Sequence, residues 1–277
     1  MRITLKLIFL IIITNSMGCD GRHHKVEHEQ TFRRVKESRT LRCGYAIWPS
    51  TVEKNPDGTL GGIFVDYMNL LGLAINTRIE WTAEVPFADL ATAISSGRVD
   101  AICAGIWPTS SRALALTFTQ PIAYNTIGAY VRADETRINS EELPPDAIIA
   151  TIDGELSESL SQQRYPKIKR YALPKMSDGA MLMLALTTRK ADITFTDPLM
   201  ANRYMQKHPG MIRELKLERP LAAFGLTIAL GKGEFSLKEA IDTATQELLS
   251  SGQIEDLLKR YEQKPNEYLR VREPYRW

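Results

Sequence analysis

The chain has 277 residues, a formal net charge of +2 at pH 7 and an ordinary hydrophobic content of 44%. This length suggests one or two globular domains. Because the charge is nearly balanced, nothing indicates a nucleic acid partner. The sequence has no G-x-G-x-x-G motif and no Walker loop, so we expect neither a nucleotide nor another cofactor.

The N-terminus has the features of an export signal. A positively charged start precedes an apolar run at residues 5–13, which is too short for the roughly 20 residues that span a bilayer. A small residue and then Cys19 follow, which resembles a bacterial lipoprotein signal. We expect a signal peptide over residues 1–18 and a lipid on Cys19. Asp20 resembles the signal that keeps lipoproteins at the inner membrane of Gram-negative cells, which implies a place at the outer face of that membrane. Secretion to the periplasm without a lipid is the alternative.

A polar and charged segment follows the proposed lipidation site. Residues 19–37 show no apolar periodicity, which is typical of a flexible tether. The segment contains His23, His24 and His28, which could bind a metal. Since no cysteine or carboxylate framework fixes them, we expect a solvated tether and no metal site.

The next part of the chain alternates short apolar runs with amphipathic segments. The turn signal at residues 55–58 could mark a hairpin tip. This alternation favours right-handed crossovers and a parallel sheet. The predicted strands and helices are strands at 41–47, 78–82 and 99–104, a helix with Phe64, Met68 and Leu71 on one face, and a helix at 87–96.

The second half repeats this layout without repeating the sequence. An alternating segment at 122–132 leaves the first half, and an apolar segment at 224–230 returns to it. The elements predicted in between and after are strands at 148–152, 168–173 and 192–196, helices at 156–164 and from 177 or 178, and closing helices at 235–249 and 254–261. We therefore predict one lobe from residues 38–130 and 224–262 and another from 131–223, with 263–277 unassigned.

The stretch at residues 97–121 combines features of an anion site. Gly105 permits a turn after a buried strand, Thr109 can cap a helix, and Arg112 lies in the first helical turn. A helix start with a hydroxyl and a guanidinium suits a carboxylate. From the residues alone, a solvated Arg112 and a simple cap at Thr109 remain open.

The order of motifs in this stretch resembles the polar amino acid-binding family of periplasmic solute-binding proteins, which have the type 2 periplasmic binding fold. The motifs are Asp100-Ala101-Ile102, Ala104-Gly105, Thr109, Arg112, Phe118 and Pro121. The resemblance covers about residues 40–262. It implies an α/β fold of two lobes, each a mostly parallel sheet flanked by helices, joined by two hinge strands.

The resemblance also implies roles for individual residues. Arg112 would bind the ligand's α-carboxylate with help from Thr109, and Asp197 of the other lobe would take the α-ammonium. Without the family, Asp197 is a turn-forming residue before Pro198.

Ligands of open α/β sheets bind at the carboxyl ends of strands, which adds further candidates. Tyr45, Trp48 and Trp107 could stack on an apolar or flat ligand. Glu155 could take a cationic group or could be an ordinary acid at a helix N-terminus. Trp107 and Glu155 depart from the family's usual residues, so no single amino acid is predicted as the ligand.

Two cysteines lie in neighbouring predicted strands. Export would place Cys43 and Cys103 in an oxidising compartment, where a bridge is possible. Adjacent parallel strands rarely offer good disulfide geometry, so we expect two buried thiols.

Taken with the resemblance, these features imply a monomeric, lipid-anchored binding protein of an ABC importer. It would pass a small amino acid-like solute to a membrane permease without bond chemistry. One alternative is a cyclohexadienyl dehydratase-like enzyme, which needs a carboxylic acid in the cleft as proton donor, and Glu155 is the candidate for that role. Another alternative is a ligand-sensing receptor whose closed form is read by a second protein.

Overall fold

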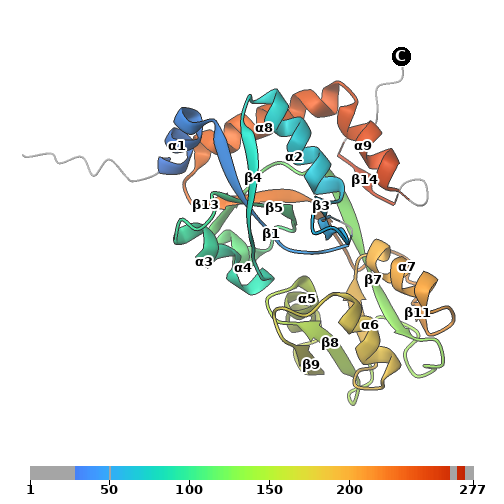
Figure 1. Cartoon of the computed structure of the whole chain (residues 1–277). Coiled ribbons are helices and arrows are strands. Elements are labelled where there is room, and N and C mark those ends of the chain that lie inside the picture. The colour runs from blue at the N-terminus through green and yellow to red at the C-terminus, as the bar shows by residue number, and fades with distance from the viewer. Residues whose placement is uncertain (1–28, 50, 263–266, 272–277) are drawn as a thin grey trace, which may run out of the picture.

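The computed structural model describes residues 29–49, 51–262 and 267–271. These residues form two lobes, each a sheet flanked by helices, and the long strand β7 (Ala123–Arg132) runs from one lobe to the other (Figure 1). The predicted two-lobed α/β class is confirmed. The signal peptide, Cys19 and the three tether histidines lie outside the described residues.

The sheet of the first lobe has the strand order β4-β1-β5-β13-β6. Its strands are β1 (Thr40–Tyr45), β4 (Arg78–Glu84), β5 (Ala101–Ile106), β6 (Leu116–Phe118) and β13 (Thr227–Gly231). The pairs of β1 with β4 and β5 are parallel, whereas β13 is antiparallel to its neighbours. All six residues of β5 are buried, as expected of a central strand covered on both faces.

Helices and a hairpin complete the first lobe. They are the hairpin β2 (Glu53–Lys54) and β3 (Leu60–Gly61), the short helix η1 (Phe87–Asp89), and the helices α2 (Ile63–Ala74), α3 (Leu90–Ser95), α4 (Ser110–Ala113), α8 (Phe235–Ser250) and α9 (Gln253–Tyr261). The Asn55 N–H donates to the Thr59 carbonyl at 2.8 Å, so the expected turn lies at the hairpin tip.

The sheet of the second lobe has the order β11-β7-β10-β8-β9. Its further elements are β8 (Ile148–Ile152), β9 (Lys169–Leu173), β10 (Ile193–Thr196), β11 (Ile212–Glu214), α5 (Leu156–Arg164), α6 (Ala180–Thr187) and α7 (Pro198–Lys207). Strand β8 and helix α5 have the bounds that the sequence predicts. Helix α7 was not predicted, because Asp197-Pro198 looked like a turn; here Asp197 is the N-cap and Pro198 the first helical residue.

The connection between the lobes is more elaborate than predicted. The predicted single return strand is two strands, β12 (Ala222–Gly225) and β13, because pairing passes from β7 in the hinge to β5 in the first lobe. The unassigned C-terminal segment contributes β14 (Leu269–Arg270), which pairs antiparallel with β7. Two crossings of the chain and an added strand therefore surround the hinge.

The prediction of a flexible tether is wrong for residues 30–37. They belong to helix α1 (Gln30–Ser38), which docks on the first lobe through the buried side chain of Val35. The Glu234 carboxylate accepts the free N–H groups of Thr31 at 3.0 Å and Phe32 at 3.2 Å at the helix start. The apolar periodicity of this segment is weak, because Val35 is the one buried side chain of the helix and Phe32 is only partly buried.

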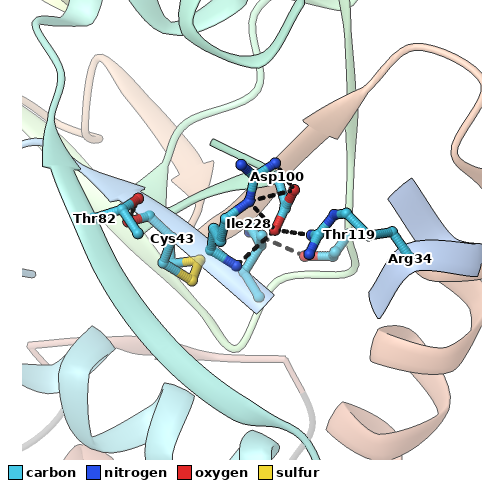
Figure 2. Close-up of a disulfide and its surroundings, with 8 residues drawn as sticks. Arg34, Cys43, Thr82, Asp100, Thr119 and Ile228 are labelled. Atoms are coloured by element: carbon cyan, nitrogen blue, oxygen red, sulfur yellow. Dashed lines mark hydrogen bonds and ion pairs between the residues drawn. A yellow bond between two sulfur atoms is a disulfide. The ribbon is translucent and has the colours of Figure 1, made fainter. Parts of the chain in front are cut away.

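The prediction of free thiols is also wrong. Cys43 of β1 and Cys103 of β5 form a disulfide (Figure 2). Cys43 lies opposite Ala101 in the register, so the bridge runs diagonally between the strands. The two Cα atoms are 5.6 Å apart, within the range that a disulfide requires.

Two apolar clusters hold the molecule together, one mainly in each lobe. Trp48 follows β1 of the first lobe, yet its side chain packs in the cluster of the second lobe with Met183 and Met200. Within the described ranges, no helix is long and apolar enough to cross a bilayer.

Candidate ligand-binding site

A cavity of about 20 Å³ lies between the lobes. Trp48, Gly105, Trp107 and Arg112 of the first lobe line it, with Glu155 at the start of α5 in the second lobe. A space of this size holds about one water molecule, so the lobes are closed and an amino acid does not fit.

Arg112 is held at this cavity by its own helix start. The Thr109 hydroxyl caps α4 by accepting the Arg112 N–H at 3.3 Å. The guanidinium donates to the Trp107 carbonyl at 3.0 Å and, across the cleft, to the Gly154 carbonyl at 2.8 Å. It also lies 5.7 Å from the centre of the Phe87 ring.

The charge of Arg112 is poorly compensated. Among the described residues, no carboxylate lies within ion-pair distance of its guanidinium. Burial lowers the pKa of Arg112, and the negative charge of Glu155 partly opposes this shift. A guanidinium that donates only to neutral carbonyls in a closed space is suited to receive an anionic group.

Glu155 is buried, with 4% of its surface exposed, and caps α5. Its carboxylate accepts the Ser157 N–H at 2.7 Å and also the Ser157 hydroxyl. Burial raises the pKa of Glu155, and the donors of Ser157 and Leu156 and the charge of Arg112 oppose this shift. The cavity is therefore lined by one basic and one acidic side chain.

Asp197 lies fully buried behind Trp48. Its Oδ1 accepts the Met200 N–H at 3.0 Å, which caps α7, and its Oδ2 accepts the Trp48 indole N–H at 2.7 Å. Asp197 does not line the cavity itself. Trp48 thus both lines the cavity and donates its indole N–H to Asp197.

Aromatic rings wall the cavity. The Trp48 ring meets those of Phe87 and Trp107 edge to face, at centroid distances of 5.8 and 6.5 Å. Sequence reasoning missed Phe87, which is the first residue of the helix predicted at 87–96. It lies just past the carboxyl end of β4, and that position is the signal that could have found it.

Gly105 has a backbone requirement. Its φ is +69°, and a Cβ there would come within 2.8 Å of both Phe64 and Thr51. Glycine is therefore needed for both the conformation and the close approach of these side chains.

The remaining predicted residues lie at different places. Thr109 lines an outer pocket of about 280 Å³, which shares Arg112 and Glu155 with the cavity. Tyr45 packs edge to face on Trp81, at a centroid distance of 5.9 Å, and is not among the cavity-lining residues. In the described part of the chain, no cluster of His, Cys, Asp and Glu could hold a metal ion.

Comparison with known proteins agrees with this architecture. The family model of bacterial extracellular solute-binding proteins, family 3, matches residues 41–264. The chain is 25% identical to the glutamate-binding protein GluB of Corynebacterium glutamicum over 216 residues, which cover 74% of this chain and 72% of that protein.

Two further similar proteins have names that refer to enzymes. Membrane-bound lytic murein transglycosylase F of Maricaulis maris is 27% identical over 225 residues, which cover 78% of this chain and 48% of that protein. The solved structure of the ancestral amino acid-binding protein AncCDT-1, a precursor of cyclohexadienyl dehydratase, matches with a TM-score of 0.72. The identity is 20%, over 83% of this chain and 98% of that one, and shows the shared fold. Because the family model spans most of the chain, the protein belongs to the bacterial extracellular solute-binding proteins, family 3.

Proposed function

We propose that this protein is the solute-binding component of an ABC importer and closes around a small amino acid-like ligand. The observation that carries this proposal is the Arg112 guanidinium, which lines a closed interlobe cavity and, among the described residues, donates hydrogen bonds only to backbone carbonyls. A ligand carboxylate would give it a charge-assisted pair. The relative GluB, named for glutamate binding, supports an amino acid as ligand.

Asp197 is proposed as the partner of the ligand's α-ammonium. It lies in the lobe opposite Arg112, so cationic and anionic groups on opposite sides would fix the orientation of a zwitterion. The Trp48 indole N–H now donates to the carboxylate at 2.7 Å. An ammonium would therefore replace this donor, or share the carboxylate with it, when the ligand enters.

The remaining parts of the proposal rest on the sequence and on the family. Hinge motion around β7 and β12 would open the lobes and admit the ligand. The closed form would deliver it to a membrane permease. A lipid on Cys19 would keep the monomeric protein at the outer face of the inner membrane, in the periplasm.

An enzymatic role deserves a test because of Glu155. A buried carboxyl with a raised pKa beside a cation could donate a proton, as a dehydratase requires. The proposal nevertheless remains with binding, since the residues directly after Asp197 are Pro198, Leu199 and Met200, none of which is an acid. Incubation with prephenate or arogenate distinguishes the two, because turnover by the wild type that is lost in Glu155→Gln would establish the enzyme.

Arg112→Ala should weaken ligand binding. A thermal-shift screen of amino acids identifies ligands, because a bound ligand raises the melting temperature by mass action. We expect the variant to bind the best ligand at least about 30-fold more weakly in calorimetry, since truncating one partner of a buried charge pair costs about 2 kcal/mol or more. The variant should still unfold cooperatively.

Arg98→Ala provides the matched control for this experiment. Arg98 is an exposed arginine of the same lobe, outside the cavity. Its variant should bind like the wild type. Unchanged affinity in Arg112→Ala would refute the proposed carboxylate site.

A further inference from the structure

The acid at position 155 has a consequence for the ligand's charge. Arg112 is the charged group that compensates the Glu155 carboxylate across the cavity. If a ligand carboxylate binds Arg112, as proposed above, it competes with Glu155 for the positive charge of Arg112. It also brings a second negative charge close to Glu155. Uncompensated charges are costly in a closed site from which water is excluded.

The geometry leaves Glu155 without a cation in contact. Among the described residues, no Lys, Arg or His lies within ion-pair distance of its carboxylate. The Ser157 N–H and hydroxyl satisfy part of its hydrogen-bonding capacity but supply no full charge. If the α-ammonium binds Asp197, as proposed above, a neutral amino acid leaves this acid uncompensated, whereas a ligand with an additional cationic group balances it.

The walls of the cavity suit such a group. Trp48, Phe87 and Trp107 line the space beside Glu155, and Phe87 already has a guanidinium near its ring face, that of Arg112. Aromatic faces attract cations, most strongly where water is excluded.

One further donor indicates that the ligand keeps its carboxylate. The Trp107 indole N–H is buried and has no hydrogen-bond partner among the described residues. Trp107 and Arg112 both line the cavity, so a ligand that brings a hydrogen-bond acceptor suits these two side chains. A simple amine would satisfy neither donor.

We propose that the ligand is an α-amino acid with a cationic side chain and that Glu155 is the residue that selects it. This inference rests on the proposed function. It depends on a residue at which the chain departs from the usual pattern of its family.

The test compares ligands that differ in charge and little else. Calorimetry on the purified protein measures L-arginine against L-citrulline, in which a neutral urea replaces the guanidinium, and L-lysine against L-norleucine. We expect the cationic member of at least one pair to bind about tenfold more tightly, or better. In Glu155→Gln that ratio should fall to within about threefold.

Glu158→Gln is the matched control variant. Glu158 lies in the first turn of the same helix, accepts the Gly154 N–H at 2.7 Å and lines the outer pocket instead of the cavity. The variant should keep the preference for the cationic ligand. If Glu155→Gln does not fold, Glu155→Asp replaces it and should retain the preference, because it keeps the charge.

The outcomes separate this inference from the proposed function. Binding of neutral amino acids as tight as that of their cationic counterparts, with Arg112→Ala still abolishing it, overturns the inference and leaves the proposed function standing. A cationic preference that persists in Glu155→Gln, or one that is lost in Glu155→Asp, also overturns it. Failure of every amino acid to bind refutes the proposed function itself.

Discussion

Trp48 joins the two lobes through one side chain. It follows a strand of the first lobe, packs in the apolar cluster of the second, and donates its indole N–H to the buried Asp197. A Cβ on Gly179 would come within 2.8 Å of the Trp48 ring, so the second lobe leaves room for this indole where it approaches its backbone. The Trp48 indole therefore connects the two lobes and also lines the cavity.

Trp48→Phe tests the value of this tie. The variant keeps an aromatic ring in the second lobe but leaves the Asp197 Oδ2 without its indole donor. We expect the free energy of unfolding, measured with urea, to fall by about 1–3 kcal/mol, the usual cost of removing one partner of a buried hydrogen bond. Trp81→Phe is the control for the loss of ring size, because Trp81 is half-buried in the first lobe. Equal losses in the two variants would show that the hydrogen bond contributes little.

Some site residues were predictable and others were not. Gly105, Trp107, Arg112 and Glu155 line the cavity, and each lies near the end of a strand, just past it or at a helix start, at positions that can be recognised in the sequence. The contact between Trp48 and Asp197 joins residues 149 positions apart, so no local pattern could reveal it.

At the scale of elements, the disulfide staples β1 to β5 in the centre of the first sheet. Next to it, the Asp100 carboxylate accepts the Arg42 N–H at 2.7 Å and pairs with Arg34 of α1 (Figure 2). The start of the described chain, the first strand and the central strand are thereby connected at one place. These contacts fix β5, the strand whose far end carries Gly105, against β1 and α1.

The loss of this disulfide should be costly. Cys43 and Cys103 are 60 residues apart, and closing a loop of that length in the unfolded chain is worth about 4 kcal/mol in the chain-entropy model. We expect the Cys43→Ala/Cys103→Ala double variant to lose about this much free energy of unfolding in urea. A reductant should destabilise the wild type but not the double variant, which has no disulfide to reduce. A reduced wild type with unchanged stability, its thiols verified by titration, would contradict the expectation.

The elements that the sequence predicts poorly have a common physical reason. Strand β8, which is a nearly continuous apolar run, matches its predicted bounds, and so does helix α5, which buries Leu156 and Leu160 at helical spacing. Helix α1 and strand β14 depend instead on polar and ionic contacts with distant residues. Arg270 of β14, for example, pairs with Glu255 at 2.8 Å and also with Glu262, both supplied by the end of the first lobe. Periodicity does not report such contacts.

The whole molecule is closed by contacts of two kinds. Two ion pairs join the lobes near the surface, an exposed one between Lys175 and Asp89 at 2.7 Å and a half-buried one between Arg203 and Glu53 at 2.6 Å. Inside, Arg112 bonds the Gly154 carbonyl and Trp48 bonds Asp197. Exposed pairs usually contribute less than about 1 kcal/mol each, so the buried contacts should dominate the closed state.

This closed state predicts the kinetics of ligand binding. An amino acid cannot enter a cavity of about 20 Å³, so the lobes must open before the ligand binds. When opening precedes binding, the observed rate approaches the opening rate at high ligand concentration instead of rising without limit. We therefore expect the rate of the tryptophan fluorescence change, followed by stopped flow with L-arginine as the probe, to level off.

The variants should change the level of this plateau according to the contact they remove. Trp48→Phe removes the buried hydrogen bond to Asp197 and should raise the plateau rate. Lys175→Ala removes an exposed ion pair and should leave the plateau rate nearly unchanged. Because Trp48 itself contributes to the fluorescence signal, the rate for Trp48→Phe should be verified from the time course of heat release in a calorimeter. A rate that stays proportional to ligand concentration up to about 10 mM would mean that the lobes already stand open in solution, since binding would then meet no prior step.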